Sequence, residues 1–195
     1  DIKRPKYPII FTKSTFSINA PFGDIPLRKD VSTELDWESE LAIVIGKPGI
    51  HIKKEEAYNH IFGYMVLNDI SARDIQRNHK QFFLGKSLPG ACPIGPCIVS
   101  KDEIHDPHDL KISCKVNDVI KQESNTKYQI FDIPSQIESI SKSTYLAAGD
   151  IIATGTPEGI CRILRTESQP SIEFLDLIGT PITGRVVIEA TIPGR

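Results

Sequence analysis

Three acidic residues, Asp36, Glu38 and Glu40, alternate along the chain directly before the apolar segment 41–45. This pattern predicts one strand that enters a core, with the three carboxylates on one face and successive Cβ atoms about 7 Å apart. Like charges beside a buried segment repel one another and lose solvation, and a divalent cation would offset both costs. Acid pairs also occur at exposed strand ends, so this spacing alone leaves a solvated strand end as the alternative.

A second acidic element favours the metal interpretation. Asp69 follows the apolar segment 61–67, and Ser71 is predicted to cap the next helix, with Asp74 three residues later in a loose form of the capping box. The end of a buried strand, just before a helix N-terminus, is a usual place for a functional carboxylate. Two glutamates and an aspartate offer hard oxygen ligands without sulfur or imidazole, which favours magnesium, manganese or calcium over zinc.

Five ordered blocks of the sequence resemble the fumarylacetoacetate hydrolase superfamily: D-W-E-S-E-L-A-I-V-I-G, N-D-I-S-A-R-D-I-Q, F-F-L-G-K-S, C-P-I-G-P and G-D-I-I-A-T-G-T-P-E-G. They lie roughly within residues 8–160. The resemblance implies that Glu38, Glu40 and Asp69 hold a divalent metal, with magnesium or manganese expected and calcium as a third candidate. It also implies a mixed, β-rich α+β fold, the β-sandwich roll of the family's C-terminal domain with short helices, and a homodimer.

The other candidate site residues follow the acidic ones along the chain. Lys86 would ordinarily be a snorkelling surface lysine, but beside a carboxylate-bound metal its charge could stabilise an enolate or oxyanion. The resemblance implies this catalytic role for Lys86 and substrate contacts for Gln76 and Thr156, although turn formation alone would explain the Thr156 loop. Arg73 shares a helix face with Gln76 and is a further substrate-binding candidate; an ordinary ion pair with Asp74 is the alternative.

Composition and charge exclude several classes of function. The chain has 195 residues, of which 23 are basic and 25 acidic, so its formal charge of −2 favours neither nucleic acid nor an anionic membrane as a partner. No segment approaches the roughly 18 apolar residues of a membrane span, and no secretory segment opens the chain. The four cysteines lack C-x-x-C spacing, so we expect reduced thiols in a cytoplasmic protein, although their even number would allow disulfides.

The length predicts a single catalytic domain over residues 1–195 with a sizeable core. Beside the strand that carries the acids, we predict strands at 7–12, 24–27, 151–154 and 185–192, a hairpin of 110–116 with 119–123, and helices at 53–60, 73–80 and 133–141. Segment 99–109 is predicted to be a loop. Strands outnumber helices, which indicates a β-rich domain.

These parts predict an electron sink. A metal would chelate adjacent oxygens of a small 2-oxo acid or 1,3-dicarbonyl, and carbon–carbon cleavage by water, decarboxylation and isomerisation all pass through the resulting enolate. Our first prediction is hydrolysis of acylpyruvates or related 1,3-dicarbonyl acids, such as fumarylpyruvate, in the breakdown of aromatic compounds. The alternatives are decarboxylation of a 2-oxo diacid such as oxaloacetate, isomerisation of 2-hydroxyhepta-2,4-diene-1,7-dioate, and a catalytically silent binding or structural protein.

The sequence departs from the resemblance at two places. Hydrolytic members activate water with a His-x-x-Glu on a mobile N-terminal segment, yet residues 1–20 contain no histidine. The chain opens at Asp1 without a methionine, so we expect that this lid segment either precedes Asp1 or is not used. Residues 160–170 replace the expected glycine-rich continuation, which leaves closure over the substrate unpredicted.

Overall fold

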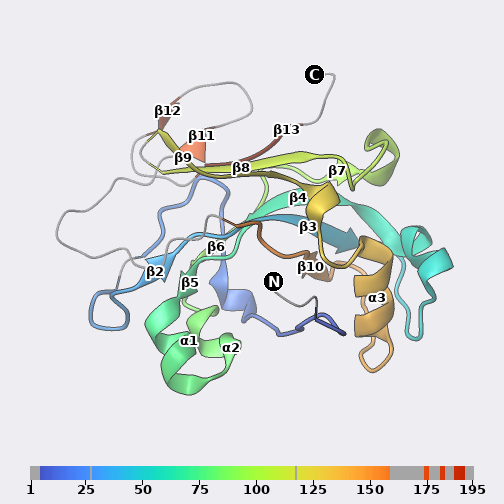
Figure 1. Cartoon of the computed structure of the whole chain (residues 1–195), viewed down its shortest axis with the longest axis horizontal. Coiled ribbons are helices and arrows are strands. Elements are labelled where there is room, and N and C mark those ends of the chain that lie inside the picture. Colours follow the sequence, from blue (N-terminus) through green and yellow to red (C-terminus); the bar gives the residue numbers. More distant parts are fainter. Residues whose placement is uncertain are drawn as a thin grey trace.

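The computed structural model describes residues 5–26, 28–116 and 118–158, together with the backbone of three strand segments at 174–175, 181–182 and 187–191. Strands form two layers, with β8, β9 and β13 in one and β3, β4, β7 and β10 in the other (Figure 1). The helices are short and lie at the ends of these layers. The predicted β-rich α+β class is therefore confirmed.

The central sheet holds the candidate site. It is antiparallel, in the order β10 (Ile151–Ala153), β3 (Ser39–Ile45), β4 (Ile61–Asn68) and β7 (Val99–Ser100). The second sheet has the order β13 (Val187–Thr191), β8 (Lys111–Val116) and β9 (Val119–Asn125). Three short ladders complete the described strands, namely β1 (Ile18–Asn19) with β6 (Cys92–Pro93), β2 (Leu35–Asp36) with β5 (Ser71–Ala72), and β11 (Phe174–Leu175) with β12 (Pro181–Ile182).

Helical elements connect these strands. They are η1 (Thr15–Ser17), η2 (Lys54–His60), α1 (Arg73–His79), α2 (Phe82–Gly85), η3 (Lys101–Glu103), η4 (Thr126–Tyr128) and α3 (Ile133–Ser141). The three predicted helices are confirmed as η2, α1 and α3, and the predicted hairpin as β8 and β9. In α3, Asp132 caps the N-terminus by accepting the Ser135 amide N–H at 2.7 Å, and Pro134 occupies the first turn, where its missing N–H costs nothing. Among the described residues, no helix is long and apolar enough to cross a membrane.

Strand β3 is buried on both faces, and this fixes where the acids lie. Its residues Leu41, Ile43 and Ile45 pack in the core that also holds Ile133 and Ile137 of α3. The alternate residues of β3 face the opposite way and form a second core with β4 and β6. Each fully buried aliphatic side chain contributes roughly 1.5–3 kcal/mol, so a slip by one residue is strongly disfavoured. The register of β3 therefore holds even-numbered side chains, Glu40 among them, on the face opposite α3.

The acidic stretch is not one strand, and this corrects the sequence prediction. Asp36 ends β2 and pairs with Ser71 of β5, whereas β3 begins only at Ser39. The change of partner occurs because β4 ends at Asn68, so the chain before Ser39 meets a different segment beyond the end of β4. Asp36 therefore lies in a different strand from Glu40.

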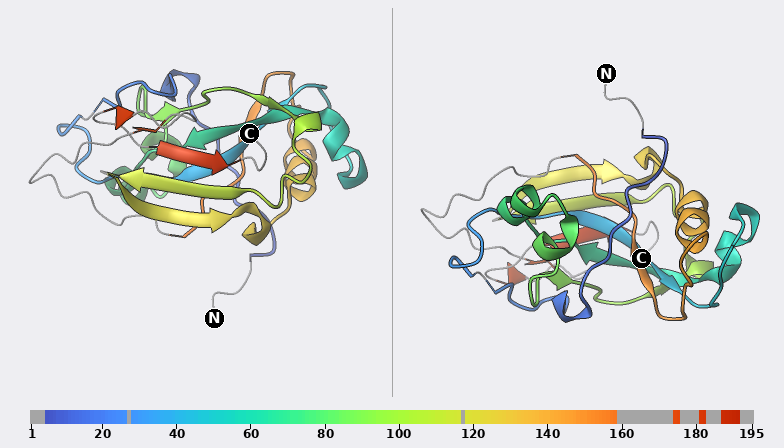
Figure 2. Two further views of the ribbon diagram at one scale, coloured as in Figure 1. Left: turned by 90° about the horizontal axis from the view of Figure 1, so that it is seen from above. Right: turned by 90° about the horizontal axis from the view of Figure 1, so that it is seen from below.

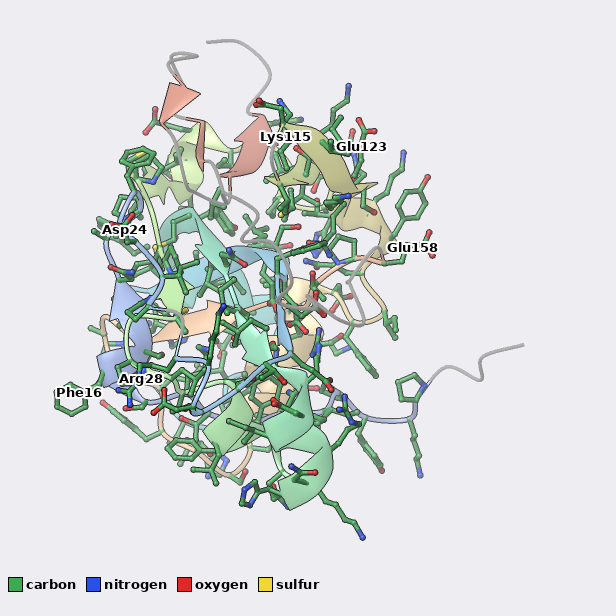
Figure 3. The ribbon with its side chains drawn as sticks, turned by 90° about the vertical axis from the view of Figure 1, so that its left-hand side faces the viewer. Phe16, Asp24, Arg28, Lys115, Glu123 and Glu158 are labelled. Carbon is green, nitrogen blue, oxygen red and sulfur yellow. The ribbon has the colours of Figure 1, made fainter. Side chains whose placement is uncertain are left out.

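The N-terminal segment was predicted to be a strand at 7–12, and this is wrong because no ladder forms there. Pro8 removes one amide donor, and the segment runs instead across the central sheet on the side of α1 and α2 (Figure 2). Phe11 anchors it with an edge-to-face contact to Phe82 of α2, at 5.1 Å between ring centroids. Phe16 projects outward and is 84% exposed (Figure 3).

Other sequence predictions have mixed outcomes. The described part of 24–27, residues 24–26, is not a strand, because Pro26 and the preceding turn interrupt it. The N-cap residue of α1 is Ala72, which makes no side-chain hydrogen bond, so the predicted Ser71 cap is wrong. The Ser71 hydroxyl instead donates to the Asp69 carbonyl at 2.9 Å.

Segment 99–109 is a loop apart from β7 and η3. Residues 160–170 lie outside the described residues, and Cys92, Cys97 and Cys114 are free thiols.

Candidate metal centre and active site

Three buried carboxylates meet at the ends of β3 and β4. One oxygen from each of Glu38, Glu40 and Asp69 lies within 4.8 Å of the others, and their exposed fractions are 6%, 4% and 1%. The backbone fixes this arrangement, because the Asp69 N–H donates to the Glu38 carbonyl at 2.8 Å and the Glu38 N–H donates to Asn68 Oδ1 at 3.1 Å. We call these three residues the acidic cluster. It brings together the residues that the sequence predicted as metal ligands.

The electrostatics of the acidic cluster suit a divalent cation. Burial raises the pKa of Glu40 to about 8, and repulsion from Asp69 and Glu38 adds to this effect. The Gly155 N–H donates to Glu40 Oε2 at 2.6 Å and favours the ionised form, although burial outweighs it. Three hard oxygen donors with no sulfur or imidazole match magnesium, manganese or calcium. The residues present therefore fit the predicted metal.

Lys86 lies between two members of the acidic cluster. Its Nζ contacts Glu38 Oε2 at 2.5 Å and Asp69 Oδ2 at 2.7 Å, and the side chain is buried. Burial lowers the pKa of this ammonium, but the carboxylates of Asp69 and Glu38 together raise it above its ordinary value. Gly85 lets α2 pack close enough to β5 for Lys86 to reach the acidic cluster. A Cβ at position 85 would lie 2.8 Å from the Ala72 carbonyl oxygen and would push α2 away.

A second lysine, Lys13, reaches the acidic cluster from the N-terminal segment. Its Nζ contacts Asp69 Oδ1 at 2.5 Å and donates to the Lys86 carbonyl, while the neighbouring Ser14 N–H donates to Ser87 Oγ at 2.9 Å. Sequence reasoning missed Lys13, because no spacing links it to an acid 56 positions later. The only local signal is a lysine that follows an apolar segment.

Arg73 contacts the acidic cluster and also Gln76, with which it shares a face of α1 as the sequence predicted. The Arg73 guanidinium donates from Nε to Asp36 Oδ2 at 2.8 Å, from Nη2 to Glu38 Oε1 at 2.5 Å, and from Nη1 to Gln76 Oε1 at 2.9 Å. Asp36 therefore does not join the acidic cluster but holds the arginine that contacts Glu38. This corrects the expectation of three aligned acids.

The alternative of an Arg73–Asp74 ion pair is wrong. Asp74 accepts hydrogen bonds from the Ser32 hydroxyl at 2.7 Å and from the Thr33 N–H at 3.1 Å. These hydrogen bonds lower the pKa of Asp74, although burial opposes them. Asp74 thus fixes the loop before β2 to the start of α1.

Thr156 lies in the loop after β10, directly after the glycine that binds Glu40. Its Oγ1 accepts a hydrogen bond from Gln122 Nε2 at 2.9 Å. No sequence pattern indicated a role for Gln122, which occupies an ordinary position in the second strand of a predicted hairpin. Of the seven predicted site residues, three form the acidic cluster, Lys86 and Arg73 contact it, and Gln76 and Thr156 contact Arg73 and Gln122 respectively. The roles of all seven stay predictions.

The fold and the site define a class of protein. The chain matches the family model described as fumarylacetoacetate (FAA) hydrolase C-terminal over residues 1–192. It belongs to this family, and the resemblance drawn from the sequence motifs is confirmed.

Individual relatives differ in the reaction that their names give. The oxaloacetate tautomerase YisK of Bacillus subtilis is 49% identical over 156 residues, which are 80% of this chain and 52% of YisK. The structure resembles a fumarylacetoacetate hydrolase from Exiguobacterium antarcticum with a TM-score of 0.80 and 39% identity, over 95% of this chain and 62% of the other. It also resembles a 2-hydroxyhepta-2,4-diene-1,7-dioate isomerase from Mycobacterium marinum with a TM-score of 0.77 and 39% identity, over 82% and 62% of the two chains. The chain spans about half the length of the oxaloacetate tautomerases it matches.

Proposed function

We propose that this protein catalyses, with a divalent metal, the interconversion of the keto and enol forms of oxaloacetate or a closely related 2-oxo diacid. The observation that carries the proposal is the buried acidic cluster with the Lys86 ammonium against it. Both halves of an electron sink are thus present, namely a cation site and a fixed positive charge. The 49% identity to an oxaloacetate tautomerase supports the choice of substrate.

The acidic cluster would hold magnesium or manganese through Glu38, Glu40 and Asp69. When bound, such an ion supplies Lewis-acid polarisation of adjacent substrate oxygens. Lys86 contributes a second charge. In the metal-free protein Asp69 and Glu38 keep the pKa of Lys86 above its ordinary value, so this ammonium is suited to stabilise negative charge.

The charges around the site favour an anionic substrate. Four carboxylates face three cationic side chains, and these are Asp36, Glu38, Glu40 and Asp69 against Lys13, Lys86 and Arg73. The fully ionised set carries one net negative charge, and a divalent ion would reverse it to one net positive charge. Clefts of one sign attract ligands of the opposite sign, so the loaded site would favour a dicarboxylate.

Two side chains are suited to contact the substrate. The Arg73 contact occupies the carbonyl oxygen of Gln76 and leaves its amide group to donate. Thr156 offers a hydroxyl next to the glycine that binds Glu40. Arg73 itself is engaged by Asp36 and Glu38, so we assign it the orientation of Glu38 instead of direct substrate binding.

The reactions named for the relatives favour tautomerisation over hydrolysis, since oxaloacetate tautomerases that are 47–49% identical are among them. Both reactions need the enolate stabilisation that the acidic cluster and Lys86 would supply. Hydrolysis of acylpyruvates, our first prediction from the sequence, is the second candidate. The structural similarity to a fumarylacetoacetate hydrolase supports it.

The direct test follows the ultraviolet absorbance of enol-oxaloacetate as it converts to the keto form. We expect the purified protein to accelerate this conversion with magnesium or manganese, to lose the effect on chelation, and to lose it in Lys86→Met. Glu55→Gln, an exposed position in η2, is the matched control and should be unchanged.

Pyruvate release from oxaloacetate and from an acylpyruvate is measured in parallel. No metal-dependent acceleration of the enol–keto conversion by the wild type would overturn the proposal. Pyruvate formed from the acylpyruvate without such acceleration would establish the second candidate instead.

A further inference from the structure

Gln122 is a buried amide on a strand whose neighbouring side chains face solvent. It lies in β9 and is 1% exposed, whereas Lys121 and Glu123 are exposed, and Glu123 points to the outside of the molecule (Figure 3). A buried amide is costly unless its polar atoms are hydrogen-bonded. The contacts of Gln122 therefore show what this position does.

The orientation of the Gln122 amide is fixed by two partners that each have one role. The Ser39 N–H can only donate, and it faces Gln122 Oε1 at 2.9 Å. The Pro157 carbonyl can only accept, and it faces Gln122 Nε2 at 3.0 Å. A flipped amide would oppose both partners, so the NH₂ group must point to the loop that holds Thr156.

This orientation determines what the Thr156 hydroxyl can do. Gln122 Nε2 donates to Thr156 Oγ1 at 2.9 Å, so this oxygen acts as an acceptor toward Gln122. The single hydroxyl hydrogen of Thr156 is then left to donate to another group. Thr156 directly follows Gly155, whose N–H binds Glu40. Thr156 is therefore held next to the residue that contacts the acidic cluster, with its hydroxyl hydrogen left to donate.

We propose that Gln122 is a positioning residue that sets the Thr156 hydroxyl as a hydrogen-bond donor to a carboxylate or carbonyl oxygen of the 2-oxo acid. Gln122 also binds Ser39, the residue between Glu38 and Glu40. One side chain from the second sheet therefore links Ser39 to the loop that holds Thr156. The inference rests on the proposed function and deepens it, because it names the residue that orients the Thr156 hydroxyl.

The test measures binding of oxalate to the magnesium-loaded 195-residue protein by calorimetry. Oxalate is a planar dianion with adjacent oxygens, like the chelating end of a 2-oxo acid, and its binding needs no turnover. Gln122→Met keeps the side-chain length but cannot hydrogen-bond through an amide. Gln122→Glu, when ionised, would accept the Thr156 hydrogen, and Thr156→Val removes the hydroxyl. Glu123→Gln on the outer face of β9 is the matched control.

We expect Thr156→Val and Gln122→Met each to weaken oxalate binding by about tenfold to a hundredfold, the range for a lost hydrogen bond to a charged group. The double variant should bind within about threefold of Thr156→Val, because Gln122 acts through Thr156. Magnesium affinity without oxalate should change by less than about threefold, and the kinetic loss should lie in KM more than in kcat. Glu123→Gln should match the wild type.

Several results would overturn the inference. These are unchanged oxalate binding in Gln122→Met, additive losses in the double variant, or a loss of magnesium affinity that parallels the loss of oxalate. If Gln122→Met does not fold, the same cycle with Gln122→Glu decides, since its loss must also vanish in the Thr156→Val background. Oxalate binding without tautomerisation of oxaloacetate would overturn the proposed function and leave this inference standing.

Discussion

Magnesium binding by this protein should strengthen steeply between pH 6 and pH 8, because Glu40 must lose a proton to become a ligand. Burial, with repulsion from Asp69 and Glu38, raises the pKa of Glu40 to about 8 in the metal-free protein. Below that pH the ion must displace a proton, and binding and deprotonation are then linked. In the metal-free protein Lys86 stays charged in this window, because its pKa lies above the ordinary lysine value.

The magnitude follows from the ionised fraction of Glu40. With a pKa of about 8, roughly 1% of the protein has an ionised Glu40 at pH 6 and about half has it at pH 8. The apparent association constant should therefore rise about 50-fold over this range, or about 2 kcal/mol, and then level off.

Isothermal titration calorimetry in buffers of different ionisation enthalpy measures both the affinity and the protons released. We expect about one proton released per magnesium ion at pH 6 and about half a proton at pH 8. Glu40→Gln should bind magnesium weakly and without this pH dependence, whereas the exposed control Glu55→Gln should behave as the wild type.

A flat affinity between pH 6 and pH 8, with no proton release, would refute this reasoning. It would mean that Glu40 is already ionised and that burial does not dominate its electrostatics.

The free energy of unfolding should change with pH in the opposite direction to metal affinity. A carboxyl whose pKa is higher in the folded than in the unfolded state makes the metal-free protein less stable as the pH rises from about 4.5 to 8.

Three further predictions concern other parts of the site. Lys86→Met leaves two buried carboxylates without their shared ammonium, so metal-free unfolding in urea should show a loss of about 3 kcal/mol or more; an unchanged midpoint would contradict this. Gly85→Ala forces α2 away from a backbone carbonyl of β5 and should cost about 1–3 kcal/mol and lower the turnover, with wild-type turnover as the contrary result. Burial raises the pKa of Cys92 and Cys114 to about 12, so exposed Cys97 should react before these two with a thiol reagent in peptide mapping at pH 8; equal labelling of the three would count against it.

The parts of the fold that the sequence predicted have local causes. Alternating acids before an apolar segment predicted that Glu38 and Glu40 share one side of the chain, because extended backbone repeats every two residues, and the two carboxylates do meet although Glu38 precedes β3. Isoleucines at helical spacing, with a proline in the first turn, predicted α3. Two strand-like segments around a tight turn predicted the hairpin. Each of these patterns holds within about ten residues, so no knowledge of the tertiary structure was needed.

The parts that the sequence did not predict depend on partners far along the chain. Asp36 lies outside the acidic cluster because its strand, β2, pairs with β5 instead of continuing into β3. Lys13 and Gln122 reach the site from the N-terminal segment and from the second sheet, at 56 and 83 positions from their partners Asp69 and Ser39. Strand propensity at 7–12 failed for the same reason, because a strand also needs an edge to pair with.

The ligands of the acidic cluster belong to two adjacent strands of the same ladder, since Glu38 and Glu40 flank the first residue of β3 and Asp69 follows the last residue of β4. An ion shared between them would cross-link the two central strands of the sheet, β3 and β4, at one end. Such an ion would bind only the folded chain, so the melting temperature should rise with the logarithm of the metal concentration above Kd. The thermal stability and the catalytic activity of the protein would then both depend on the concentration of the same ion.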